Sequence, residues 1–141
     1  MDSFFDSAIR HWEDGRILLR EERYDNAVCL FGLSVECALK NMLDLVYAGQ
    51  IDLKQAYSHN IEQAFDDLYL LLANLLEMPL FDSAFGLKFS QYNFQGVLLQ
   101  DHPERRYFET GTYGFRDAVD CEKTAASLVK ELIMMHIDGY N

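Results

Sequence analysis

Hydrophobic residues recur along most of the chain at intervals of three and four, the spacing of amphipathic helices. This pattern predicts a first helix over about residues 4–23 and a last helix over about 117–137. Between them, the segment 26–45, NAVCLFGLSVECALKNMLDL, is apolar on nearly every side apart from Glu36 and Lys40. A helix that is apolar on most sides is typical of the centre of a core. The pattern therefore predicts a central helix carrying one acidic and one basic residue.

Residues with strong local preferences set the ends of the first two helices. Ser3 is predicted to cap the first helix, and Asp25 the central one. Gly49 is predicted to end the central helix in the left-handed conformation. Residues 50–59 are then expected to form a linker.

The second half of the chain contains less regular patterns. Asn60 followed by Gln63 resembles a capping box for a third helix over about 61–77, which Pro79 ends. The aromatic segment that follows favours a fourth helix over 82–91, and residues 100–116 are expected to be a loop. Long helices joined by short loops predict an all-α, up-and-down antiparallel bundle of four to five helices.

Length and composition narrow the class of protein. The 141 residues form one domain, 1–141, and no stretch reaches the roughly 20 apolar residues of a membrane span. The net charge of −11 argues against broad nucleic-acid binding, so we expect no DNA partner, and any RNA contact must be local. Three cysteines without zinc-like spacing predict reduced thiols, a cytoplasmic location and no metal or cofactor.

Two groups of residues are candidates for a site. His102, Arg105, Arg106 and Tyr107 form a compact basic and aromatic cluster, in which arginine suits phosphate and tyrosine suits stacking on a base. The alternative is that the two arginines pair with nearby carboxylates. Glu36 and Lys40 lie one helical turn apart and form either a structural ion pair or a ligand-facing pair.

Several of these features together resemble HEPN domains, which are small all-helical modules of nucleotide and RNA biology. The junction from Tyr24 to Ala27 and the Glu36–Lys40 spacing are similar to the family's first turn and its Glu-x-x-x-Lys pattern. His59 before the third helix and the pair Arg106–Tyr107 before the last helix complete the likeness, which covers about residues 9–133. The resemblance implies a HEPN-like bundle that forms a homodimer.

The resemblance also implies a setting. Non-catalytic family members bind nucleotides, or pair with a nucleotidyltransferase in toxin–antitoxin or phage-defence modules of prokaryotes. Ribonuclease members carry an arginine followed four to six residues later by a histidine, and no such pair occurs here. We therefore expect a nucleotide- or RNA-linked accessory domain without the usual ribonuclease motif. Two alternatives stay open: a metal-independent ribonuclease with a displaced site at His102 and Arg106, and a non-catalytic dimeric scaffold for protein partners.

Overall fold

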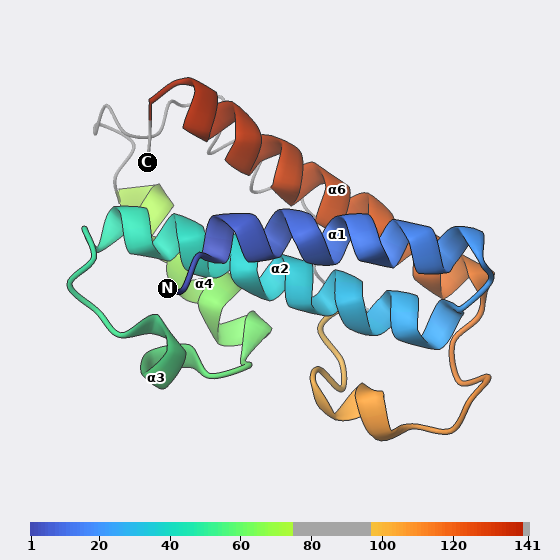
Figure 1. Cartoon of the computed structure of the whole chain (residues 1–141). Coiled ribbons are helices and arrows are strands. Elements are labelled where there is room, and N and C mark those ends of the chain that lie inside the picture. Colours follow the sequence, from blue (N-terminus) through green and yellow to red (C-terminus); the bar gives the residue numbers. More distant parts are fainter. Residues whose placement is uncertain (75–96, 140–141) are drawn as a thin grey trace.

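The computed structural model describes residues 1–74 and 97–139, and every regular element in these ranges is a helix (Figure 1). The helical bundle expected from the hydrophobic spacing is thus confirmed. The elements are α1 (Phe4–Arg20), α2 (Tyr24–Val46), α3 (Leu53–Tyr57), α4 (Ile61–Asn74), the 3₁₀ helix η1 (Glu104–Tyr107) and α6 (Phe115–Ile137).

Helix α2 lies at the centre, as predicted, because α1, α4 and α6 all pack against it (Figure 1). Helix α1 runs antiparallel to α2. Helix α6 begins beside the start of α2, where the Phe115 and Tyr24 rings are 5.9 Å apart. It ends beside the start of α1, where His136 stacks on Phe5 at 4.7 Å.

The core of the bundle is made largely by α2. Its fully buried apolar residues face several neighbouring helices rather than one, and each large aliphatic or aromatic side chain contributes about 1.5–3 kcal/mol of transfer free energy. They are Ala27, Val28, Phe31, Val35, Ala38, Leu39, Met42 and Leu43. This burial explains why the segment is apolar around most of its circumference.

One of the predicted helix ends is confirmed, one is confirmed in part and one is wrong. The Ser3 side chain accepts a hydrogen bond from the Asp6 amide at 3.1 Å. Gly49 has the expected left-handed φ of 71°, but α2 ends earlier, at Val46, and Ala48 already has a positive φ of 52°. Asp25, however, lies inside the first turn of α2 rather than at its cap. Its carboxylate instead accepts hydrogen bonds from the amides of Gly111 and Tyr113, at 2.8 and 3.0 Å. Asp25 therefore binds amides of a distant loop instead of the amides at the start of its own helix.

The linker predicted over 50–59 contains the short helix α3, so that prediction was incomplete. Asp52 caps α3 by accepting from the Gln55 amide at 3.2 Å. Asn60 caps α4 as expected, with the Gln63 amide 3.0 Å from its side-chain oxygen. The Gln63 side chain turns to Asp67 instead of closing a capping box.

The connection before α6 contains more structure than predicted. The predicted loop over 100–116 contains η1, a short turn that hydrophobic spacing cannot reveal. The predicted helix over 82–91 and the role of Pro79 lie outside the described residues. Within residues 1–74 and 97–139, no helix is both long enough and apolar enough to cross a membrane.

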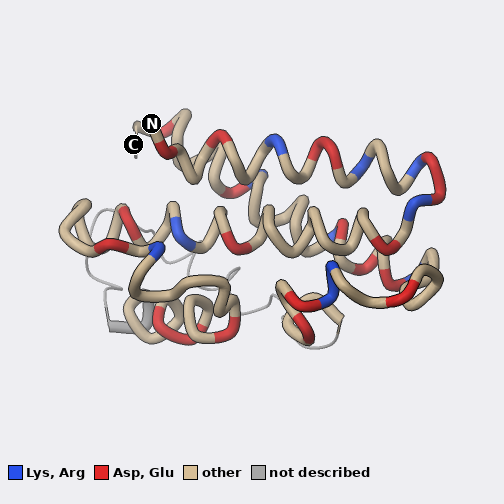
Figure 2. The backbone as a smooth tube through the Cα atoms, turned by 60° about the horizontal axis from the view of Figure 1, so that its bottom comes forward, with Lys and Arg blue, Asp and Glu red and all other residues tan. Residues whose placement is uncertain are grey.

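Charge is spread along the helices rather than gathered. Lys and Arg are scattered among the more numerous Asp and Glu along the backbone (Figure 2). Such mixing fits the expectation that the protein has no broad positive face for nucleic acid. Recognition of an anion therefore depends on individual basic residues placed by the fold.

We predict that Gly15→Ala destabilises the protein, although alanine normally favours a helix by about 1 kcal/mol over glycine. A Cβ at Gly15 would lie 2.6 Å from the ring of Phe31, which is fully buried and has no room to move. We expect a loss of about 1–3 kcal/mol in the free energy of unfolding, measured by urea denaturation. Glu13→Ala, on the exposed side of α1, is the control and should change stability little. A more stable Gly15→Ala protein would contradict the close packing of α1 on α2.

Candidate functional site

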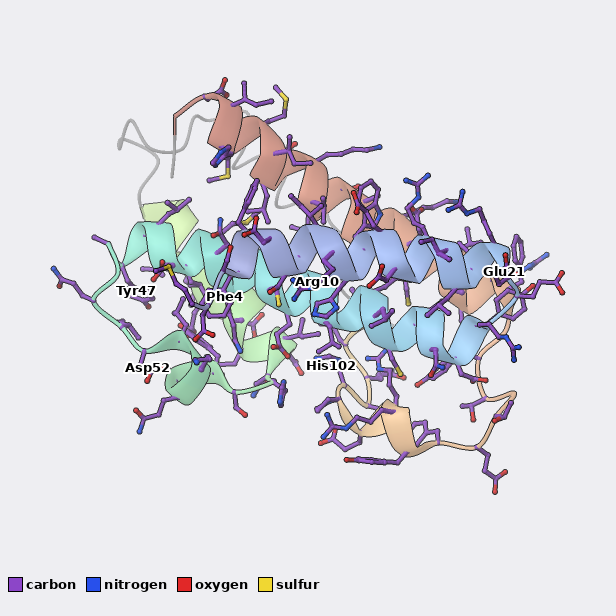
Figure 3. The ribbon with its side chains drawn as sticks, in the orientation of Figure 1. Phe4, Arg10, Glu21, Tyr47, Asp52 and His102 are labelled. Carbon is purple, nitrogen blue, oxygen red and sulfur yellow. The ribbon has the colours of Figure 1, made fainter. Side chains whose placement is uncertain are left out.

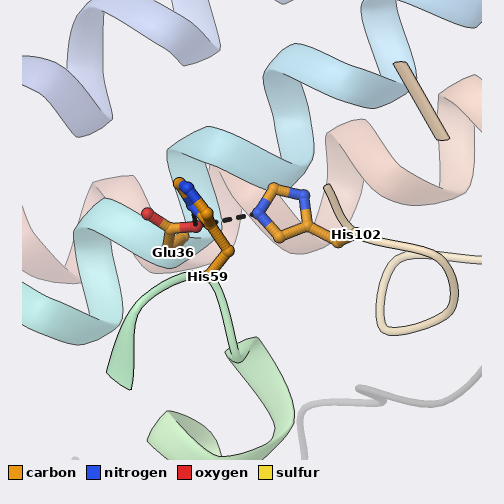
Figure 4. A group of neighbouring side chains, drawn as sticks. All are labelled: Glu36, His59 and His102. Atoms are coloured by element: carbon orange, nitrogen blue, oxygen red, sulfur yellow. Dashed lines mark hydrogen bonds and ion pairs between the residues drawn. The ribbon is translucent and has the colours of Figure 1, made fainter. Parts of the chain in front are cut away.

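The candidate site is built around the buried carboxylate of Glu36 (Figure 4). One of its oxygens, Oε1, lies 2.8 Å from Nδ1 of His59 and 2.9 Å from Nε2 of His102. The other oxygen, Oε2, lies 3.2 Å from the Lys40 ammonium. Lys40 also donates to the backbone carbonyl of Ser58. The carboxylate thus has three side-chain donors, which come from three separate parts of the chain.

The fold places each of these groups for a local reason. Glu36 and Lys40 are one turn apart on α2, so they meet as the sequence predicted. His59 stands directly before Asn60, the cap of α4. His102 reaches α2 from the segment before η1 (Figures 3 and 4). It approaches so closely that a Cβ at Gly32 would lie 2.8 Å from its Nδ1. The small residue on α2 makes this contact possible.

The hydrogen bonds keep Glu36 ionised. Burial raises the pKa of its carboxyl group, but the hydrogen bonds from His102 and His59 and the charge of Lys40 together outweigh burial. They lower the pKa from 4.5 to about 2. An ionised carboxylate only accepts hydrogen bonds, so both histidines donate to it. The site is therefore a carboxylate with fixed donors rather than a carboxylic acid.

These hydrogen bonds also fix which nitrogen of each histidine carries a proton. His59 donates from Nδ1, which leaves Nε2 for a ligand or a reacting group. Its side chain is 47% exposed. His102 donates from Nε2, and its buried Nδ1 has no hydrogen-bond partner. A proton on that Nδ1 would be a buried donor without an acceptor, so the Nε2–H tautomer fits. His102 holds the carboxylate, while His59 faces outward.

Glu36, His59 and His102 are also a possible set of metal ligands. Their three nearest donor atoms lie within 4.8 Å of one another, and zinc takes imidazole and carboxylate ligands. A metal ion would replace both protons that now bind the carboxylate, and the Lys40 ammonium would stand close to it. His102 would then carry its proton on the unpartnered Nδ1. The arrangement therefore fits a carboxylate held by hydrogen bonds from the two histidines better than a metal site.

A groove of about 600 Å³ opens beside these residues. His59 and His102 form one side of it, and Arg106 brings a positive charge to the same groove. Its other lining residues come from the end of α3, the start of α4, the segment before η1 and the start of η1: Tyr57, Ser58, Asn60, Ile61, Glu62, Leu99, Pro103 and Glu104. The groove therefore combines one arginine, one outward histidine, two glutamates and apolar wall residues.

The structure separates the cluster that the sequence suggested at 102–107. Arg106 lines the groove, but Arg105 is only 3% exposed and does not line it. Tyr107 is 78% exposed and lies outside the groove, although its ring stacks with the Arg106 guanidinium at 4.9 Å. The cause is η1, because a 3₁₀ helix turns about 120° per residue and sends three neighbours in three directions.

The residue that sequence reasoning undervalued is His59. Its position directly before a predicted helix is more typical of a cap or a satisfied polar group than of a ligand, yet it is the exposed one of the two histidines that bind Glu36. Within the described residues, neither Arg105 nor Arg106 forms the carboxylate pair that the alternative predicted. Lys40 and Glu36 do form the structural pair, but Glu36 also holds both histidines.

The fold and the site together define an all-helical protein with a buried carboxylate–histidine centre. Comparison with protein-family models, with curated proteins and with solved structures found no match to this chain. The likeness to HEPN domains thus depends on the residues named above.

We predict that Glu36→Gln destabilises the protein in a pH-dependent way. The folded-state pKa lies below the ordinary value of 4.5, so ionised Glu36 stabilises the fold above that pH. This contribution is lost as the pH falls from 4.5 towards 2. The shift corresponds to about 3 kcal/mol at neutral pH. Urea denaturation of both proteins at several pH values should show a large difference at pH 7 that narrows below pH 4.5. A difference that does not depend on pH would contradict this account.

Proposed function

We propose that this protein is a nucleotide- or RNA-linked domain whose ligand occupies the groove beside η1. The observation that carries the proposal is that His59, oriented by Glu36, shares this groove with Arg106. Arginine recognises phosphate through charge-assisted hydrogen bonds, and the outward Nε2 of His59 adds a second polar group. The groove volume, about 600 Å³, falls within the usual range of small-ligand sites.

The setting of this function follows from the resemblance to HEPN domains. We place the protein as an accessory domain of a prokaryotic toxin–antitoxin or phage-defence module, acting as a homodimer in the cytoplasm. A nucleotidyltransferase or another protein is the expected partner. The net charge of −11 supports a local site in preference to general RNA binding.

We predict that a nucleotide, cyclic dinucleotide or short RNA raises the melting temperature of the protein, because binding to the folded state stabilises it. Arg106→Ala and His59→Asn should each weaken the affinity, the arginine change by about tenfold or more, measured by calorimetry. Arg116→Ala is the matched control, since Arg116 is exposed and lies outside the groove. If no ligand of these classes binds, the dimeric scaffold becomes the better interpretation.

A second candidate function is RNA cleavage, and the hydrogen bond between Glu36 and His59 favours it. With Nδ1 bound to the carboxylate, His59 presents Nε2 as a proton acceptor. His59 would take the proton of a ribose 2′-hydroxyl, whose oxygen would then attack the neighbouring phosphorus. The bond to the 5′ oxygen breaks, that oxygen takes a proton from water, and a 2′,3′-cyclic phosphate remains. Arg106 would stabilise the phosphate charge, and His102 would position Glu36.

We predict for this second function that His59→Ala lowers the rate of RNA cleavage by about 100-fold or more. Short RNAs of varied sequence are incubated with protein in the presence of a metal chelator, and the products are examined for 2′,3′-cyclic phosphate ends. Arg116→Ala should keep the full rate, which excludes a general effect of purification or charge. Binding without cleavage by the unaltered protein would leave the non-catalytic function and remove this one.

A further inference from the structure

A second cavity, of about 400 Å³, also borders η1. Its walls come from the beginning of α2 and from the loop between η1 and α6. The lining residues are Glu22, Arg23, Tyr24, Asp25, Asn26, Cys29, Arg105, Arg106, Phe108, Thr110, Gly111 and Tyr113. Arg106 belongs to both hollows, but no histidine lines this one.

Among the described residues, Arg105 is a buried cation without a counter-ion. Two backbone carbonyls, those of Leu98 and Gln100, each accept from its Nη2 at 2.6 Å. Its Nε and Nη1 are buried and have no hydrogen-bond partner. Across residues 1–74 and 97–139, no carboxylate lies within ion-pair distance of it. An unpaired buried charge is costly, so an anion that supplied the missing acceptor would be held strongly.

The charge of Arg105 lies next to the cavity. Its guanidinium carbon is 6.0 Å from the ring centre of Tyr113, which lines the cavity. It also acts on Cys29, another lining residue. Burial raises the pKa of the Cys29 thiol, and the positive charge of Arg105 opposes that rise. Arg105 itself lines the cavity, so its guanidinium lies close to the cavity wall and not in a remote part of the core.

The N-terminus of α2 faces the same cavity. Tyr24, Asp25 and Asn26 form its first turn, and all three line the cavity. The cap residue, Arg23, makes no side-chain hydrogen bond to this turn. The first amides of a helix lack intrahelical partners, and the helix dipole favours an anion there. A 23-residue helix therefore adds a second, independent attraction for negative charge.

The acidic residues of the cavity reduce this attraction but do not cancel it. The Asp25 carboxylate is occupied by the amides of Gly111 and Tyr113, so it serves to hold the loop against α2. Three arginines stand against Asp25 and Glu22, which gives the cavity a positive balance in a chain of net charge −11. The cavity is thus a local exception to the charge of the protein.

We propose that this cavity binds a small oxyanion, a phosphate group or a carboxylate, between Arg105 and the first turn of α2. This site is distinct from the groove of His59 and does not depend on the function proposed for that groove. The anion accepts from the unpartnered donors of Arg105 and from free amides of α2. Phosphate and carboxylate share this chemistry, and phosphate offers more acceptor oxygens.

The test uses the full chain with inorganic phosphate as the probe and sodium chloride to hold the ionic strength constant. Isothermal titration calorimetry measures affinity, while the Nε–H signal of Arg105 in ¹⁵N-resolved NMR reports on the site itself. We expect saturable binding and a movement of that signal with phosphate. An acetate titration distinguishes the two classes of anion, since a stronger response to acetate identifies a carboxylate site.

Variants then locate the bound anion. Arg105→Lys keeps the buried charge but removes the planar set of donors, and should weaken phosphate by about tenfold. Arg23 is exposed, so Arg23→Gln leaves the core unchanged, and it should weaken phosphate binding by about threefold. His59→Asn and Arg116→Gln should leave it unchanged, which separates this site from the groove. Absence of saturable binding, or equal affinity in Arg23→Gln and Arg105→Lys, would overturn the proposal.

Discussion

The buried carboxylate of Glu36 is the interaction on which the rest of this structure depends. Removing a carboxylate from water is costly, and three donors offset that cost here: His59, His102 and Lys40. His59 and His102 tie two different connecting segments to the central helix, while Lys40 lies on that helix itself. Lys40 also holds the turn after α3 through the Ser58 carbonyl. One negative charge thus organises the side of the bundle where connecting segments, rather than long helices, cover α2.

The central helix can play this part because small residues let its neighbours approach. Gly32 gives room for the ring of His102, which would meet a side chain at 2.8 Å. On its other side, the Ser34 hydroxyl donates to the Ala8 carbonyl of α1 at 2.7 Å, within a fully buried contact. Close approach on two sides leaves Glu36 little access to water. The same packing that makes the core dense therefore strengthens the hydrogen bonds at the site.

The features that could be predicted from the sequence are those decided by neighbours in the chain. Ser3 and Asn60 each act within one helical turn, and each was placed correctly. Gly49 has the expected left-handed φ, although α2 ends earlier, at Val46. Asp25 was misplaced because its partners, the amides of Gly111 and Tyr113, come from the loop before α6. The spacing of residues around Asp25 cannot predict a contact with a loop more than 80 positions later in the chain.

The same limit applies to the site. The Glu36–Lys40 pair follows from helical spacing, and the structure confirms it. The addition of His59 and His102 requires two connecting segments to meet on α2, which no spacing rule predicts. His59 therefore read as an ordinary residue before a helix cap. Its importance comes entirely from a carboxylate 23 positions earlier in the chain.

The short helix η1 determines how two adjacent arginines serve different places. A 3₁₀ turn buries Arg105 beside the cavity and leaves Arg106 between the cavity and the groove, so both arginines border the cavity but only Arg106 reaches the groove. In a protein with few basic residues, the position of each arginine matters more for anion binding than the number of arginines. Each arginine meets a different second attraction for anions, His59 in the groove and the start of α2 in the cavity. The two anion sites proposed above act only at short range, so they are compatible with an acidic protein that repels a long polyanion.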